Sequence, residues 1–194
     1  MTPEAMVLSF TFYSMLGWLY ESTICSLHKE KKLINRGFLL GPYCPVYGVG
    51  AVLSYLTLHA VQNPLVIFLA AAVLCSVVEY VTGWGMETLF HAKWWDYSNF
   101  PFQLHGRICL YGACLFGAFN VVICRWAEPT LLSALSDYNP FIVQTAAVVI
   151  TLLMATDAIL TLVSWENLNQ HLCSIRTKLQ EKSEQTVDKG DASQ

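Results

Sequence analysis

The sequence has few charged residues: they make up 13% of its 194 residues, whereas 55% are hydrophobic. A soluble domain carries about 25% charged residues, so the composition excludes a solvated globular domain. A formal net charge of −3, with no basic cluster interleaved with aromatic residues, excludes nucleic acid as a partner. No lysine or arginine precedes Lys29, so we expect no cleaved signal peptide.

Motifs of several common enzyme classes are also missing. The sequence has no G-x-x-x-x-G-K-[ST] loop for ATP, no H-E-x-x-H zinc motif and no G-x-S-x-G nucleophile motif. Its seven cysteines form no C-x-x-C pair and lie mostly in apolar stretches, which indicates buried, reduced thiols. We therefore expect no cofactor and no metal site, although His91 and His105, on either side of an aromatic loop, leave a metal site open.

Five long apolar stretches dominate the chain. A helix needs about 20 residues to cross the hydrocarbon core of a bilayer, and these stretches meet that length. They lack an alternation of period two and are too long for barrel strands. The sequence predicts an all-α, polytopic membrane protein in which residues 1–165 form a bundle of five transmembrane helices in a lipid bilayer. The expected spans are residues 5–27, 42–61, 65–90, 108–126 and 141–165.

The basic residues predict the orientation of this bundle. Ten of the eleven lysines and arginines fall in the loops after spans one and three or in the C-terminal tail, and Arg125 is the exception. Basic residues collect on the cytoplasmic side of a membrane. We therefore expect the N-terminus outside the cell membrane and the C-terminus in the cytoplasm.

The C-terminal segment divides into two parts. Apolar residues recur at steps of four, three and four, at Leu168, Leu172, Ile175 and Leu179. This spacing predicts a cytoplasmic amphipathic helix over residues 166–183, packed on the bundle or against a second copy. Residues 184–194 are polar and small, and we expect them to be disordered.

A pair of short patterns occurs twice in the chain. The pattern W-x-x-E-[ST] begins at Trp18 and again at Trp84, and R-x-x-L-x-G begins at Arg36 and again at Arg107. The first and third spans run in the same direction, so a true duplication would be a parallel repeat of helix pairs, with its axis along the membrane normal. Coincidence in a tryptophan-rich membrane chain is the alternative.

Acidic side chains lie inside the predicted spans. A charge at the middle of a bilayer costs at least about 2.5–3.5 kcal/mol, so each carboxylate needs a partner, a proton or a cation. In one interpretation, Arg36 and Arg107 pair with Glu21 and Glu87 and fix the helix register. In the other, the charged groups line a polar cavity that opens to the cytoplasm. The candidate residues of a substrate or ion pathway are Glu21, Arg36, Glu79, Glu87, Asp96, Arg107 and Asp157.

Two stretches near these charges are unusual. The loop of residues 91–112 is rich in aromatic side chains, which favour packing at the headgroup boundary or against the bundle over exposure to water. Residues 41–50 combine two prolines with several glycines, which predicts a broken helix with free N–H groups or a simple helix start at Pro45. The candidate residues of a lid or partner-docking surface are Trp94, Trp95, Tyr97, Pro42, Pro45 and Tyr47.

Two blocks of the sequence resemble a known family. R-G-F-L-x-G-P-x-x-P-x-Y-G-x-G-A at residues 36–51, and W-D-Y-S with P-F-x-L-x-G-R-I-C-L at residues 95–110, are similar to signature blocks of a bacterial integral membrane family of type IV ABC-transporter permeases. The W-x-x-E-[ST] pattern of the first span resembles that family's N-terminal block. The resemblance covers about residues 10–127. It implies a membrane permease component that works with a separate ATPase.

We therefore predict a permease component of a transporter rather than an enzyme. So small a bundle seldom encloses a pathway alone, so we expect a homo- or hetero-oligomer. Three alternatives stay open. In a stand-alone, ion-coupled carrier, the carboxyl groups of Glu79 and Asp157 would titrate. An intramembrane enzyme acting on a lipid or isoprenoid would use Asp96 and the two histidines of the aromatic loop, and a membrane scaffold would use the ion pairs alone.

Overall fold

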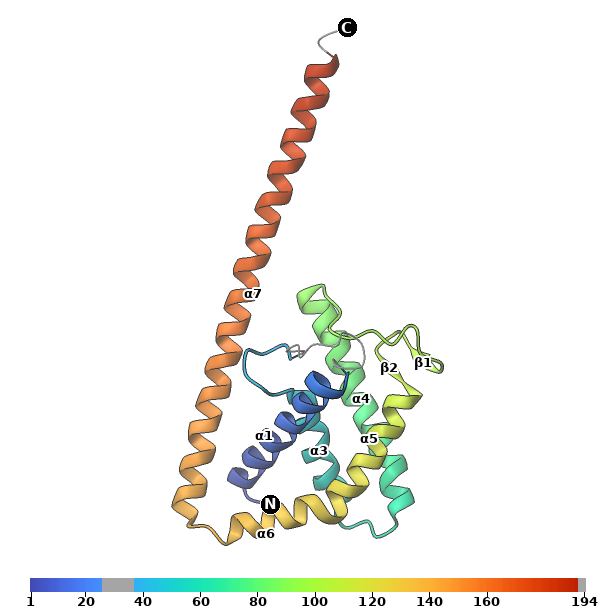
Figure 1. Cartoon of the computed structure of the whole chain (residues 1–194), viewed down its shortest axis with the longest axis vertical. Helices are drawn as coiled ribbons and strands as arrows, with labels where there is room; N and C mark the ends of the chain where they lie inside the picture. Colours follow the sequence, from blue (N-terminus) through green and yellow to red (C-terminus); the bar gives the residue numbers. More distant parts are fainter. Residues whose placement is uncertain (26–36, 192–194) are drawn as a thin grey trace. The chain divides into compact units, whose positions relative to one another are not determined.

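The computed structural model of the chain describes residues 1–25 and 37–191, with side chains for residues 1–23 and 37–166. Within these residues the fold is all-α apart from one two-stranded hairpin (Figure 1). The elements are α1 (Pro3–Tyr20), the π-helical turn η1 (Glu21–Cys25), α3 (Pro45–Leu58), α4 (Pro64–Phe90), β1 (Gln103–Leu104), β2 (Ile108–Cys109), α5 (Leu110–Val122), the π-helical turn η2 (Ile123–Ala127), α6 (Glu128–Ser136) and α7 (Pro140–Asp191).

In the part of the chain that the structure describes, three helical segments are long and apolar enough to cross a membrane, namely Pro64–Phe90, Leu110–Ser136 and Pro140–Glu166. α3 is apolar as well, but its 14 residues are short for a full span. The structure thus confirms an all-α membrane protein, while α1 as a further span stays a prediction. The fourth apolar segment is longer than expected, because α5, η2 and α6 follow one another directly to Ser136, beyond the predicted end at residue 126.

The chain forms two compact units, residues 1–153 and residues 154–194. α7 begins in the first unit and continues to Asp191. It runs through residues 166 and 184, where we expected the transmembrane domain and the amphipathic helix to end. The division of the C-terminal segment at these residues stays a prediction.

Prolines mark the starts of the helices in the first unit. Pro3, Pro45 and Pro64 each stand in a first helical turn, where a missing N–H costs no hydrogen bond and the fixed φ suits a helix. Thr2 and Asn63 cap α1 and α4, because their side-chain oxygens accept hydrogen bonds from backbone N–H groups at 3.3 and 2.9 Å. The simple helix start at Pro45 is therefore confirmed.

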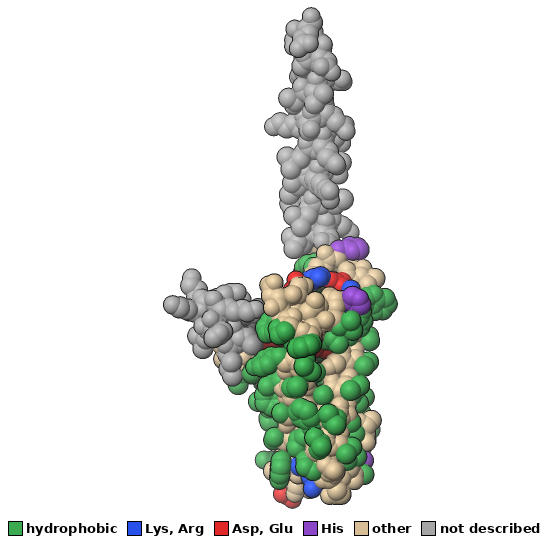
Figure 2. Space-filling view, turned by 90° about the vertical axis from the view of Figure 1, so that its right-hand side faces the viewer, with side chains coloured by type: hydrophobic (Ala, Val, Ile, Leu, Met, Phe, Trp, Pro, Cys, Tyr) green, Lys and Arg blue, Asp and Glu red, His purple; other side chains and the backbone are tan. Residues whose placement is uncertain are grey.

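Small and polar side chains occupy the interior of the first unit. Its buried residues include Ala5, Ser9, Ser14, Ala51, Ser54, Ala71 and Cys75. Many leucine, valine and phenylalanine side chains are exposed instead, and Figure 2 shows hydrophobic side chains along the length of the bundle with charged ones gathered toward its ends. Helices in lipid gain little from hiding leucine, so small residues that permit close contact occupy the interfaces.

Two glycines allow α1 and α3 to cross closely. A Cβ atom on Gly17 would lie 2.3 Å from Cγ of Tyr47. A Cβ atom on Gly48 would lie 2.3 Å from Oγ of Ser14 and 2.4 Å from the backbone oxygen of Phe10. These distances are far below van der Waals contact, so the crossing requires glycine at both positions. The crossing also sets Tyr47 against the last turns of α1.

Candidate functional site

The aromatic loop folds back onto the bundle. Residues 91–109, which we call the aromatic hairpin, contain β1 and β2 in antiparallel pairing. Gly106 has a φ of +69°, and a Cβ atom there would lie 2.7 Å from Oδ1 of Asp96, so this turn requires glycine. Oδ1 of Asp96 accepts hydrogen bonds from N and Oγ of Ser98 at 2.9 and 2.5 Å, which hold the pKa of Asp96 below its usual range. Asp96 is exposed and stabilises the hairpin turn.

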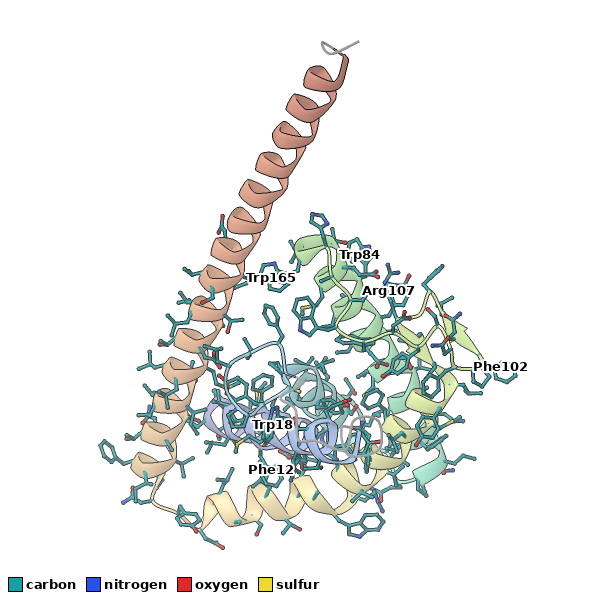
Figure 3. The ribbon with its side chains drawn as sticks, turned by 45° about the horizontal axis from the view of Figure 1, so that its top comes forward. Phe12, Trp18, Trp84, Phe102, Arg107 and Trp165 are labelled. Atoms are coloured by element: carbon teal, nitrogen blue, oxygen red, sulfur yellow. The ribbon has the colours of Figure 1, made fainter. Side chains whose placement is uncertain are left out.

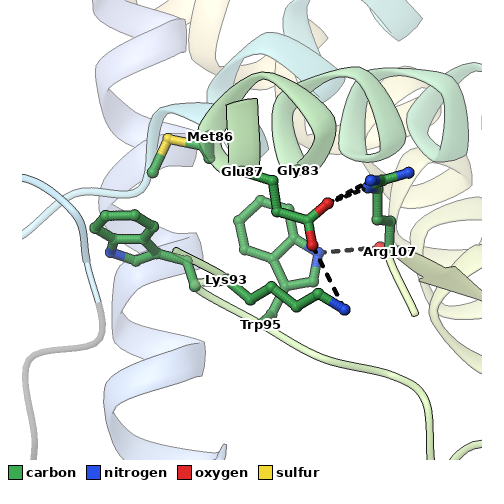
Figure 4. Close-up of a pocket in the computed structure, with 7 residues that line it drawn as sticks. Gly83, Met86, Glu87, Lys93, Trp95 and Arg107 are labelled. Carbon is green, nitrogen blue, oxygen red and sulfur yellow. Dashed lines mark hydrogen bonds and ion pairs between the residues drawn. The ribbon is translucent and has the colours of Figure 1, made fainter. Parts of the chain in front are cut away.

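Glu87 joins the aromatic hairpin to α4 through two cations (Figure 4). Arg107 donates from Nε to Oε2 of Glu87 at 2.8 Å and donates from Nη2 to the same oxygen. Nζ of Lys93 lies 3.4 Å from Oε1. The hydrogen bonds to Glu87 raise the pKa of Arg107. The predicted pairing of Arg107 with Glu87 is thus confirmed.

Trp95 seats the hairpin on α4 beside this ion pair. Its Nε1 donates to the backbone oxygen of Arg107 at 3.0 Å. Its ring packs over Gly83, where a Cβ atom would lie 3.2 Å from Cζ2 of Trp95. The small residue between Glu79 and Glu87 therefore admits an indole ring from the hairpin.

A small cavity lies between the hairpin and α4. It is lined by Gly83, Met86, Glu87, Lys93, Trp94, Trp95 and Arg107 (Figure 4). Its volume is about 10 Å³, which is room for about one water molecule and far less than the roughly 300–1,000 Å³ of a small-molecule site. In this conformation Glu87, Arg107 and Lys93 hold the hairpin against α4, and the cavity beside them is too small for a substrate.

Glu79 lies two turns before Glu87 on α4 and is 5% exposed. The hydroxyl of Tyr97 donates to its Oε1 at 2.9 Å. Burial raises the pKa of Tyr97 above its usual range, so the hydroxyl keeps its proton and stays a donor. Among the described residues, Oε2 of Glu79 has no hydrogen-bond partner and the carboxyl forms no salt bridge. Glu79 is therefore a buried acid with one donor and no compensating cation in the described part of the chain.

A second tyrosine–glutamate pair lies beside the first. The hydroxyl of Tyr47 donates to Oε1 of Glu21 at 2.6 Å. Tyr47 is also within electrostatic range of Tyr97 and Glu79. We call these four residues the tyrosine–glutamate cluster. The cluster brings together η1, the start of α3, the middle of α4 and the aromatic hairpin. Tyr47 and Tyr97, which we expected in a lid, thus contact two residues of the expected pathway.

Two of the remaining lid candidates lie away from this cluster. Trp94 packs edge-on against Phe38 and Phe90, with ring centroids 4.9 and 5.7 Å away. This contact holds the segment after residue 36 against the end of α4. Pro42 is exposed before α3.

Arg36 and Asp157 are the two pathway candidates that the structure places neither in the tyrosine–glutamate cluster nor at the aromatic hairpin. Arg36 lies outside the described residues. Asp157 belongs to the second unit, where Oγ1 of Thr161 donates to its Oδ1 at 3.2 Å within α7. Their role in a pathway stays a prediction.

The repeated W-x-x-E-[ST] pattern has partly similar surroundings in its two copies. Gly17 and Gly83 directly precede the two tryptophans. An aromatic ring packs on each glycine, from Tyr47 in the first copy and Trp95 in the second. Glu21 in the first copy accepts a hydrogen bond from Tyr47, and Glu87 in the second accepts hydrogen bonds from Arg107. Whether the halves arose by duplication stays a prediction.

Sequence reasoning missed two polar groups that the structure brings to the ends of the bundle. Tyr80 accepts a hydrogen bond from Nη1 of Arg107 at 3.1 Å and lies 3.0 Å from Nδ1 of His105. Its position seven residues before Glu87 on one helix face could have indicated this contact. Glu128 is buried at the other end of the unit. It was missed because we expected the fourth span to end at residue 126.

Replacing Arg107 with glutamine is expected to loosen the aromatic hairpin, because the neutral amide loses the hydrogen bonds to Glu87 and Tyr80. Limited proteolysis of the purified protein should then cleave residues 91–109 several-fold faster than in the wild type. Arg125→Gln is the matched control, since its guanidinium contacts the exposed side chain of Gln62 at 2.9 Å, and it should leave this cleavage unchanged. Equal cleavage in wild type and Arg107→Gln would show that the ion pair does not hold the hairpin.

Comparison with known proteins adds a family relationship to this geometry. A family model described as "Putative ABC-transporter type IV" matches residues 8–162. Neither a curated protein nor a solved structure matches the chain significantly. The matched residues include the whole tyrosine–glutamate cluster and the aromatic hairpin.

Proposed function

Because the chain belongs to the family described as "Putative ABC-transporter type IV", we propose that it is the membrane permease component of a transporter that works with a separate ATPase. The match over residues 8–162 carries this proposal. The three long apolar helices support it. The sequence has no P-loop. In this proposal the P-loop that binds and hydrolyses ATP is therefore on another chain. The proposal includes assembly with that chain or with further copies of this one.

The polar site in this proposal is the tyrosine–glutamate cluster. The distribution of basic residues predicts that the N-terminus lies outside and the C-terminus in the cytoplasm, so the cluster faces the cytoplasmic side. Glu21 accepts a hydrogen bond from Tyr47, and Glu79 accepts one from Tyr97. Two acidic groups near each other in an apolar bundle favour a cationic substrate group, a metal cation or a proton over an anion.

The aromatic hairpin is the surface that we assign to the ATPase. Phe102 directly precedes β1, is 82% exposed and points away from the bundle (Figure 3). Leu104 beside it is also exposed. Exposed aromatic and aliphatic side chains next to charged groups are typical of protein interfaces. The Glu87 ion pair would transmit movement of the hairpin to α4.

Purification from native membranes tests the proposed partner. We expect the tagged chain to recover a P-loop ATPase in a fixed ratio, and Phe102→Asp to lower this recovery at least tenfold, because a charge would be buried at the contact. Tyr138→Asp, at an exposed aromatic residue outside the hairpin, should leave recovery unchanged. Repeated recovery of the chain without any ATPase would refute the partner, and equal recovery with Phe102→Asp would refute the docking surface.

An ion-coupled carrier that needs no ATPase is the second candidate, and the uncompensated carboxyl of Glu79 favours it. In such a carrier, Glu79 would bind and release the coupling ion at each cycle. Flux in vesicles that contain the chain alone, driven by a gradient of H⁺ or Na⁺, would support this function. Flux that requires both ATP and a partner ATPase would exclude it.

A further inference from the structure

The helical segment from Leu110 to Ser136 changes direction where η2 joins α5 to α6. Its 27 residues would extend about 40 Å along one axis at a rise of 1.5 Å per residue, whereas the hydrocarbon core of a bilayer is about 30 Å thick. A π-helical turn interrupts the α-helical hydrogen bonds at η2, and Pro129 in the first turn of α6 has no N–H to continue them. Both features are usual causes of a kink. Figure 1 accordingly shows α6 running across the end of the first unit, away from β1 and β2.

One side of α6 faces the bundle. The residues of α6 that are buried or partly buried are Glu128, Leu131, Leu132 and Leu135. Their spacing places them on one face of the helix. Oε1 of Glu128 accepts a hydrogen bond from Oγ of Ser9 on α1 at 2.7 Å. This hydrogen bond holds the leucine side of α6 toward α1.

The opposite side of α6 is exposed and mostly polar. The residues of this polar side are Pro129, Thr130, Ser133, Ala134 and Ser136. On α4, by contrast, the residues exposed between positions 67 and 82 are Leu69, Val73, Val77 and Val81. Hydroxyl groups favour water or headgroups over hydrocarbon, whereas leucine and valine side chains favour hydrocarbon. The exposed side of α4 therefore fits the hydrocarbon core, and that of α6 fits a polar layer.

Side chains typical of a membrane boundary lie around α6. Trp126 in η2 and Tyr138 after α6 are 63% and 62% exposed, and tryptophan and tyrosine collect at the headgroup level of a bilayer. Nη1 of Arg125 donates to Oε1 of Gln62 at 2.9 Å. Gln62 is exposed and precedes the start of α4 at Pro64. These groups indicate that the hydrocarbon core ends near Arg125, just before α6 begins.

We propose that α6 is an interfacial helix that binds the lipid headgroup layer at the end of the bundle opposite the aromatic hairpin, and that the span begun by α5 ends at η2. Thr130 and Ser133 on the polar side face the headgroups, whose oxygens accept hydrogen bonds from hydroxyl groups. The leucine side faces the bundle and the boundary with the acyl chains, as in other amphipathic helices that lie in a membrane surface. This placement of α6 goes beyond the proposed function and does not depend on it.

The length of the remaining span agrees with this placement. α5 and η2 contain 13 and 5 residues, and together they reach the roughly 17–25 residues that a span requires. If α6 instead continued through the hydrocarbon core, Thr130 and Ser133 would face acyl chains. Trp126 would then lie away from the headgroup level that its exposed ring favours.

Photolabelling of the full-length chain in phosphatidylcholine nanodiscs tests the placement of α6. One preparation contains a phospholipid with a diazirine on its headgroup, and the other contains a phospholipid with a diazirine at the middle of an acyl chain. Mass spectrometry of peptides locates the adducts. We expect the headgroup probe to label residues 128–139 roughly tenfold more than the acyl-chain probe, because the polar side of α6 contacts headgroups. Val73 and Val77 on α4 provide the internal control, and the acyl-chain probe should label them preferentially.

Two outcomes of this labelling would overturn the proposal. Preferential labelling of residues 128–139 by the acyl-chain probe would make α6 part of the span. Labelling of these residues by neither probe would show that water or another chain, rather than lipid, covers the polar side of α6.

Thiol accessibility in the same nanodiscs gives a second measurement. A charged maleimide that does not enter hydrocarbon should modify Ser133→Cys roughly tenfold faster than Val77→Cys. Val77 is the matched control because it is 57% exposed on α4, and peptide mapping separates these positions from the native cysteines. Equal, slow modification of both variants would place α6 in hydrocarbon and refute the proposal. These results stay distinct from the recovery of an ATPase, which tests the proposed function.

Discussion

Replacing Gly48 with alanine is expected to destabilise the protein by about 1–3 kcal/mol, the usual range for overpacking a close contact. The new Cβ atom would meet the backbone oxygen of Phe10 at 2.4 Å, and a backbone atom cannot move aside as a flexible side chain can. α3 would therefore have to move away from α1, which would also separate Tyr47 from Glu21. Thermal unfolding in detergent, followed by intrinsic tryptophan fluorescence, measures the loss.

Gly85 provides the matched control for this substitution. It lies in the interior of α4, and a Cβ atom there would have no heavy atom within 4 Å. Because glycine is costly within a helix, Gly85→Ala is expected to stabilise the protein by up to about 0.5–1 kcal/mol. The two alanine substitutions should therefore shift the unfolding temperature in opposite directions. A stable Gly48→Ala protein would show that the crossing of α1 and α3 is looser than described.

Glu79→Gln is expected to abolish transport-coupled activity while the fold persists. Glutamine has the same shape and still accepts the hydrogen bond from Tyr97, but it can neither ionise nor bind a proton. Removal of a buried acid without a counter-charge should leave the unfolding temperature unchanged or raise it. If the site couples transport to hydrolysis, stimulation of the partner ATPase should fall at least tenfold. Glu166→Gln, at an exposed carboxyl on α7, is the control that should retain full stimulation.

A second variant separates a role in coupling from a role in folding. Tyr97→Phe removes the donor to Oε1 of Glu79 and leaves that buried oxygen without a partner, which costs about 1–3 kcal/mol. We expect this variant to lose stability, in contrast to Glu79→Gln. Full activity of Glu79→Gln would remove Glu79 from the pathway. An unfolded Glu79→Gln would assign it a structural role instead.

Local patterns in the sequence predicted several features of the fold and site. Apolar length predicted membrane-spanning helices, and Pro45 predicted the start of α3. The pairing of Arg107 with Glu87 was predictable because both groups were expected at the same end of the bundle. The packing of Trp95 over Gly83, by contrast, became visible only in the structure.

Other features could not be read from the chain. The donors to Glu21 and Glu79 are tyrosines 26 and 18 residues away in sequence, and in a membrane protein tyrosine more often indicates the lipid interface. Asp96 looked like a member of the acidic site, but the turn at Gly106 directs its carboxyl to Ser98. Glu128 seemed to lie beyond the membrane, because hydropathy does not reveal that η2 and α6 continue α5.

The sequence by itself determined that this is an all-α membrane protein and to which family it belongs, because hydropathy and signature blocks depend on residues close together in the chain. Tertiary structure decided which polar groups meet. In lipid, a carboxyl is stabilised by whichever donor the crossing helices and the folded hairpin bring to it. Those contacts depend on glycines that let backbones approach, and their result is visible once the helices are packed.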